Sequence, residues 1–228
     1  MLVSCTLAAA TMIHSLVDLS LSIVRFELDQ LRHLLQIIDK GIRAEMSALE
    51  VEIRRARKIR KSTHPMDDQR DSDDMASVGD LERYENYTGI VMAFVILERF
   101  LMDVLNIADS EIDNKSKDKE REFRSWRAYS KEFRSRLDID LDSEPFASLT
   151  PFREIRNKIA HQGAQTPGER SANGYELGSE IPLSAEDVSR CMDLVETCCT
   201  NIRETYFEKA LPYLKETARL RDAWDPLA

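Results

Sequence analysis

Residues 87–108 read YTGIVMAFVILERFLMDVLNIA, and this stretch decides the fold. Between residues 90 and 101 it is apolar on most sides of a helix, and Glu98 interrupts the apolar run. A helix that is apolar nearly all round must be enclosed by other elements. The apolar run is far too short to span a bilayer. We therefore predict that residues 81–108 form the central helix of an all-α bundle.

A long N-terminal helix is predicted over residues 12–63, where Gly41 is one of few breakers. Its apolar residues alternate steps of three and four, which is a heptad-like seam. The seam consists of Leu21, Val24, Leu28, Leu31, Leu35, Ile38 and Ile42. The pattern slips at Glu45, and Met46 and Leu49 carry it on. It fits either a coiled coil with a second copy or an arm packed along its own bundle, since both bury the same stripe.

The last long helix is predicted to begin at Ser184, because Ser184 and Asp187 have the spacing of a capping box. Its apolar stripe again follows steps of three and four. The stripe consists of Val188, Cys191, Val195, Cys198 and Ile202. Pro212 is expected to weaken the end of this helix. We interpret the cysteines of the stripe as core thiols rather than redox groups.

The domain organisation follows from the breaks between these helices. Residues 62–80 are polar, contain Pro65 and Gly79, and are predicted to be a flexible linker. The predicted division is an arm at 1–64, a linker at 65–80, a helical bundle at 81–217 and a tail at 218–228. The loop at 163–180 contains four glycines and is expected to shape access to a site beside it.

Charge and composition limit the classes of function. The formal charge of −9 argues against a general nucleic-acid coat protein, although a local basic patch can still bind RNA. The apolar first residues lack the positive region of a signal peptide, and His14 and Asp18 interrupt them. We expect a cytoplasmic protein with no membrane partner, and we find no metal-ligand spacing.

The segment FREIRNKIAHQG at 152–163 holds the candidate catalytic residues. A helix is predicted over 151–162, with Thr150 as its N-cap, Pro151 at its first position and Gly163 just after its end. Three apolar residues share one face of this helix: Phe152, Ile155 and Ile159. His161 is therefore expected to project away from the core, in the last turn.

The chemistry of this segment depends on three side chains. Asn157 and His161 lie roughly 150–170° from the apolar face, and Arg156 lies on its flank, roughly 70° away. A helix C-terminus favours an imidazolium, so His161 is suited to general acid and base catalysis near neutral pH. The guanidinium of Arg156 suits a phosphate. The alternative is a surface histidine beside a solvated arginine and asparagine.

The motif IRNKIAH at 155–161 resembles the signature of HEPN-domain proteins (higher eukaryotes and prokaryotes nucleotide-binding). The resemblance extends over about 81–217 and implies an antiparallel helical bundle. It implies a metal-independent endoribonuclease without a cofactor, acting as a toxin or antiphage-defence effector. Two motifs would meet in a homodimer and form one composite site. Arg156 would then stabilise the scissile phosphate, Asn157 would be the polar residue after it, and His161 would transfer protons.

The same resemblance implies a regulatory partner, such as an antitoxin. Family members controlled by a nucleotidyltransferase often carry a tyrosine two residues after the histidine. Here that position is Gly163, which puts tyrosine modification at this site in doubt.

Several charged residues are expected to support the site. Glu98 would need a partner if buried, either Arg156 or another arginine, or it would lie on an exposed edge. A row of cations at helical spacing would track an RNA backbone, or else be a solvated face broken by Glu122 and Glu132. The row consists of Arg124, Arg127, Lys131 and Arg134, beside a buried stripe of Phe123, Trp126, Phe133 and Leu137.

A second class of function competes with the nuclease. The long first helix with its seam also fits a non-catalytic helical dimer that binds a partner protein or a nucleotide. The basic run at 54–61 would face RNA in the nuclease, or simply compensate a helix dipole.

Overall fold

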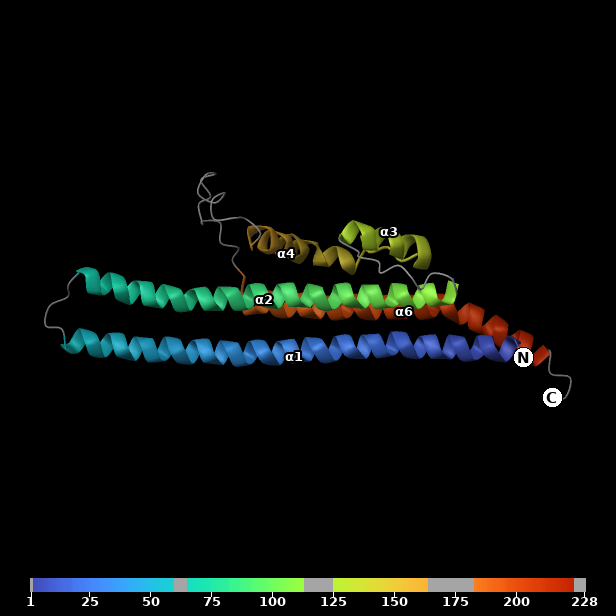
Figure 1. Ribbon diagram of the computed structural model, residues 1–228, viewed down its shortest axis with the longest axis horizontal. Helices are drawn as coiled ribbons and strands as arrows, with labels where there is room; N and C mark the ends of the chain where they lie inside the picture. Colours follow the sequence, from blue (N-terminus) through green and yellow to red (C-terminus); the bar gives the residue numbers. More distant parts are fainter. Residues whose placement is uncertain (1, 60–64, 113–124, 164–182, 224–228) are drawn as a thin grey trace. The chain divides into compact units, whose positions relative to one another are not determined.

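The computed structural model of the chain describes residues 2–59, 65–112, 125–163 and 183–223, and these ranges contain helices and no strand. This confirms the all-α class (Figure 1). The helices are α1 (Leu2–Ile59), α2 (Pro65–Ile112), α3 (Trp126–Leu137), the 3₁₀ turn η1 (Phe146–Leu149), α4 (Thr150–Gly163) and α6 (Ala185–Ala223). No helix in the described ranges is both long and apolar enough to cross a bilayer.

The chain forms two compact units. Unit 1 consists of Met1–Leu28, Ala93–Pro151 and Met192–Ala228, and unit 2 consists of Asp29–Met92 and Phe152–Cys191. Helices α1, α2 and α6 each contribute residues to both units. The division therefore does not follow the predicted boundaries at residues 64 and 80.

Helix α2 supplies many core residues of unit 1, but it is not enclosed on all sides as predicted, since Val95 is 45% exposed. Phe94, Leu97, Phe100 and Leu101 are at most 1% exposed. The α6 stripe is buried as well: Val195, Cys198 and Ile202 are 0% exposed. Burial raises the pKa of the Cys198 thiol to about 12, with Glu144 as a smaller cause, and raises that of Cys199 far above its usual range.

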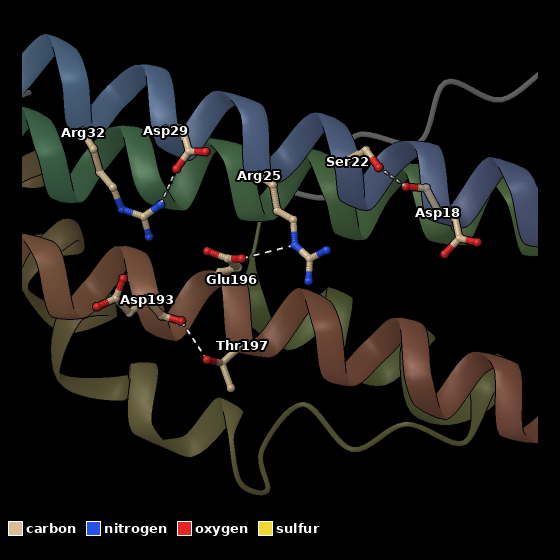
Figure 2. A network of polar contacts seen from close by, with 8 residues as sticks. All are labelled: Asp18, Ser22, Arg25, Asp29, Arg32, Asp193, Glu196 and Thr197. Atoms are coloured by element: carbon tan, nitrogen blue, oxygen red, sulfur yellow. Dashed lines mark hydrogen bonds and ion pairs between the residues drawn. The ribbon is translucent and has the colours of Figure 1, made fainter.

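The N-terminal seam packs within its own chain in unit 1. Leu21, Val24 and Leu28 are 5%, 2% and 0% exposed. Ion pairs join α1 to both neighbouring helices: Arg25 to Glu196 of α6 (3.2 Å), Asp18 to Arg203 of α6 (2.8 Å), and Glu27 to Arg99 of α2. Figure 2 shows Arg25 and Glu196 directed toward one another from α1 and α6. Of the two open alternatives, the seam of unit 1 follows the one in which the arm packs along its own bundle.

In unit 2 the same three helices approach closely at Gly89 of α2. A Cβ at Gly89 would lie 2.5 Å from Val188 Cγ1 of α6 and 3.1 Å from Leu35 Cδ1 of α1. Nearby, the Asn86 amide donates to the carbonyl oxygen of Leu183 at 3.0 Å. Gly89 therefore allows backbone and side chains to meet where any other residue would force them apart.

The prediction of a linker at 65–80 is wrong, because α2 begins at Pro65. Pro65 suits the first position of a helix. In unit 2, Asp71 of α2 pairs with Arg57 of α1 at 3.4 Å, and Val78 is 8% exposed. These contacts hold a polar segment in a helix that its composition alone does not favour.

The ends of the later helices differ in part from expectation. The capping box of α6 is confirmed, since the Asp187 N–H donates to Ser184 Oγ at 3.2 Å and the Ser184 N–H donates to Asp187 Oδ2 at 2.9 Å. α6 continues past Pro212 to Ala223, so it also passes residue 218, where a tail was predicted. In α3, the hydroxyl of the extended residue Ser125 caps a helix that begins at Trp126.

Candidate functional site

The candidate site lies on α4, which the chain enters from the 3₁₀ turn η1. Thr150 has φ −54° and ψ −46°, and its N–H donates to the carbonyl oxygen of Ala147. An N-cap residue has extended backbone, so the prediction of Thr150 as N-cap is wrong. The preceding turn supplies the helix start instead. α4 extends to Gly163, one residue beyond the predicted end.

One face of α4 packs into unit 2. Phe152 is 7% exposed, while Ile155 and Ile159 are half-buried. Glu154 and Lys158 are exposed. The predicted apolar face is present, with Phe152 as its anchor.

Arg156 and Asn157 lie side by side on α4, and both are half-buried. The Arg156 Nη1–H donates to Asn157 Oδ1 at 3.2 Å. Neighbouring residues of a helix point about 100° apart, so this bond requires the guanidinium to fold along the helix surface toward the amide. The amide oxygen then accepts from the arginine, and the NH₂ group is the donor side of the Asn157 amide.

This pair of side chains is suited to an anion. A guanidinium offers five N–H donors and a fixed positive charge, and the amide adds two more N–H donors. Donors of this kind, aimed at one place, bind phosphate oxygens by charge-assisted hydrogen bonds. The arrangement therefore has the chemistry of a phosphate contact.

His161 lies in the last turn of α4, four residues after Asn157, where helical spacing places two residues on one face. Its side chain is outside the described part of the structure, so its predicted outward direction stays a prediction. The predicted loop at 163–180 lies outside the described residues from 164 onward.

Glu98 is half-buried in unit 1, where its neighbour is Tyr129 of α3. The Tyr129 hydroxyl donates to the Glu98 carbonyl oxygen at 3.4 Å. Burial, and secondly the charge of Glu98, raise the pKa of Tyr129. Arg156 belongs to unit 2, so its expected pairing with Glu98 remains a prediction. Tyr129 was not among the predicted residues, although it lies one helical turn after Trp126 on the apolar side of α3.

The structure describes three of the four residues in the predicted row of cations. Arg127, Lys131 and Arg134 are exposed on α3, and Arg124 lies outside the described residues. Arg134 is bound to Asp140 at 2.6 Å. The backbone N–H of Asp142, and secondly Arg134, lower the pKa of Asp140. At least one cation of the row, Arg134, is therefore neutralised by an ion pair within the chain.

The predicted buried stripe beside this row is confirmed for Phe133 and is only half-buried at the two other described residues. Phe133 is 0% exposed, and Trp126 and Leu137 are half-buried, while Phe123 lies outside the described residues.

The basic end of α1 also has acidic neighbours. Arg54 pairs with Glu50 at 3.0 Å, and Arg57 pairs with Asp71. These pairs favour a structural role for the two arginines over direct contact with RNA.

Within the described ranges, no three histidine, cysteine or acidic side chains are grouped as a metal site. Comparisons with protein-family models, with curated proteins and with solved structures find no match to this chain. The functional argument therefore depends on the residues of α4 and on the resemblance of their motif.

Proposed function

We propose that this protein is an endoribonuclease of the HEPN type, which acts as a homodimer with a composite site and needs no metal. The 2′-hydroxyl of RNA attacks the adjacent phosphorus, and the bond from phosphorus to the 5′-oxygen breaks. One base removes the 2′ proton, and one acid protonates the departing oxygen. The products are a 2′,3′-cyclic phosphate and a 5′-hydroxyl.

The observation that carries the proposal is the contact between Arg156 and Asn157 on α4. It places a guanidinium and an amide side by side on the helix, and His161 follows one turn later. A phosphate held by Arg156 would thus have an imidazole within the same motif. The resemblance of residues 155–161 to the HEPN signature gives these three residues their roles.

The three residues have different tasks in this scheme. Arg156 binds the scissile phosphate and stabilises the charge that develops on its oxygens. Asn157 orients the guanidinium and donates from its amide. His161 of each protomer serves as acid or base, since an imidazole titrates near neutral pH.

The test is RNA cleavage in the presence of EDTA by the wild type and by His161→Ala and Arg156→Ala. We expect each substitution to lower the rate by about 100-fold or more, because positioned acid–base groups contribute this much. Lys158→Ala is the matched control, since Lys158 is an exposed cation of the same helix. Mass spectrometry of the products identifies the cyclic phosphate. Equal rates for the wild type and His161→Ala would contradict the proposal.

The biological role proposed is a toxin or antiphage-defence effector, held in check by an antitoxin or another regulatory protein. Expression of the wild type should arrest growth, and expression of Arg156→Ala should be tolerated. Toleration of both proteins at equal levels would contradict the effector role.

A non-catalytic helical dimer is the second candidate function. One observation favours it: the outer face of α1 is apolar, as described below. A dimer that fails to cleave RNA under any condition tested would support this alternative.

A further inference from the structure

The face of α1 that is directed to solvent in unit 1 is apolar. Leu16, Leu19, Ile23 and Phe26 are 37%, 55%, 41% and 63% exposed. They follow one another at steps of three, four and three residues, which is the spacing of a coiled-coil seam. We call these four residues the outer stripe.

The outer stripe differs from the buried stripe of the same helix. The buried stripe of unit 1 consists of Val17, Leu21, Val24 and Leu28. At 100° per residue, the two stripes lie roughly 150° apart around the helix axis. A surface helix with one buried face normally carries polar and charged residues on the other. This segment of α1 instead has two apolar faces, and the part of the chain that the structure describes covers one of them.

Every charged residue of this segment forms an ion pair within unit 1. Between residues 15 and 28 the charged residues are Asp18, Arg25 and Glu27. Each forms an ion pair with α2 or α6, on the flanks of the buried stripe. Figure 2 shows Arg25 directed toward Glu196 in this way. The outer stripe itself therefore carries no charge.

We propose that the outer stripe is a homodimer interface, in which the stripes of two copies interdigitate. Two copies of a chain with a formal charge of −9 repel each other, so a neutral face is where they can meet. Heptad spacing lets identical stripes pack knobs into holes.

The residues beside the outer stripe suit a close approach of two helices. Ser15, Ser20 and Ser22 flank the stripe and are small and uncharged. The Ser22 hydroxyl donates to the Asp18 carbonyl oxygen at 2.8 Å, so burial would not leave that donor without an acceptor. A nucleic acid would need cations here, and the stripe offers none.

The outer stripe ends at Phe26, because the next positions at steps of four and three are the polar residues Gln30 and His33. Its four side chains span about three turns of the helix. A seam of this length buries less area than a standard interface between proteins, so we expect a dimer of moderate affinity.

This inference rests on the proposed function in one respect: the dimer it describes would be the one that carries the composite site. The interface itself is argued from α1 alone. Dimerisation and RNA cleavage are therefore measured separately on the same full-length proteins.

The experiment is light scattering with size-exclusion chromatography at micromolar concentrations. We expect a wild-type dimer and a dissociation constant raised at least about 100-fold in Leu19→Glu/Phe26→Glu, because two charges on each copy would have to be buried. The matched control is Leu81→Glu/Tyr84→Glu, whose original side chains are 51% and 62% exposed on α2 of unit 2. This control should stay dimeric. Circular dichroism checks that each variant keeps its helices.

An uncharged pair, Leu19→Gln/Phe26→Gln, guards against misfolding, since glutamine is a good helix former. A monomeric wild type, or a dimer equally stable in both stripe variants, would overturn the proposal. A monomeric wild type that binds phosphatidylcholine vesicles through the stripe would assign it to lipid, and would equally overturn it.

The RNA measurement separates the two proposals. A wild-type dimer that cleaves no RNA leaves the interface intact and contradicts the nuclease. Monomeric stripe variants that cleave RNA at the wild-type rate support the interface, and contradict the composite site.

Discussion

The two compact units differ in how much apolar surface they bury. Unit 1 contains the fully buried rings of Phe94, Phe100 and Phe133. In the described part of unit 2, the buried apolar side chains are Leu31, Val78, Ile90, Phe152, Val188 and Cys191. Elements with few buried contacts open at a low free-energy cost. Among the described residues, the candidate site on α4 thus belongs to the unit with fewer buried apolar side chains.

The largest contrast is expected from removing one ring in each unit. Phe100→Ala in unit 1 should lower the free energy of unfolding by about 3–5 kcal/mol. Phe152→Ala should cost less, because Phe152 is 7% exposed and Phe100 is 1% exposed, so water can reach part of the space left behind. Urea unfolding followed by circular dichroism measures both. Equal losses would show that the two cores are equally well packed.

The next contrast uses two glycines of α2. In Gly89→Ala the new methyl group would overlap Val188, so we expect a loss of about 1–3 kcal/mol despite the gain in helix propensity. Gly79→Ala meets nothing within 4 Å and should gain about 0.5–1 kcal/mol.

Val188→Ala added to Gly89→Ala should recover part of the loss, because it removes the overlapping methyl groups. Thermal unfolding of the variants shows whether each substitution raises or lowers the free energy of unfolding. A stabilising Gly89→Ala would mean that the three helices are not in close contact there.

The smallest effect concerns Glu85 of unit 2. Partial burial, and then the charges of Asp39 and Glu82, raise the pKa of its carboxyl group, although Arg43 lowers it. The folded state therefore binds this proton more tightly than the unfolded chain does. At pH 7 Glu85→Gln should be more stable than the wild type, by less than about 1 kcal/mol. This gain should shrink as the pH falls through the raised pKa.

Asp187 is the control, because its pKa is lowered where that of Glu85 is raised. Hydrogen bonds from the N–H and hydroxyl of Ser184 lower its pKa. Asp187→Asn should therefore destabilise the protein at pH 7, and the difference should vanish as the pH falls through the lowered pKa. Parallel pH profiles for the two variants would contradict the assigned causes.

The sequence predicted the helices best where one apolar stripe determines the packing. Every residue of the predicted α6 stripe, from Val188 to Ile202, is buried. The covering of the α1 seam was beyond prediction, because periodicity shows which face is apolar but not what lies against it. Long-range ion pairs such as Asp18 with Arg203 identify the neighbour in unit 1, and no local pattern reports them.

The errors came from composition and from local rules. The polar stretch at 65–80 looked like a linker, yet Arg57 and Val78 contribute to tertiary contacts that hold it in α2. Thr150 fitted an N-cap, but the 3₁₀ turn before it already begins the helix. The outer stripe was not predicted, because the heptad-like seam already accounts for one apolar face of α1 and this helix has two.

The candidate site was predicted in its residues but not in its contacts. Arg156 and Asn157 were chosen for their types and spacing, and the structure adds the hydrogen bond between them. Side-chain rotation decides such a bond between neighbours in the chain, and the sequence does not report it.

The buried thiols of α6 give the chain a chemical reporter of its own motion. Only a thiolate reacts readily with an alkylating reagent, and the raised pKa of Cys199 removes that form at neutral pH. Labelling of Cys199 must therefore wait until α6 swings away from its neighbours and water reaches the sulfur. The rate at which Cys199 is labelled therefore measures how often unit 1 opens locally, and no engineered cysteine is needed.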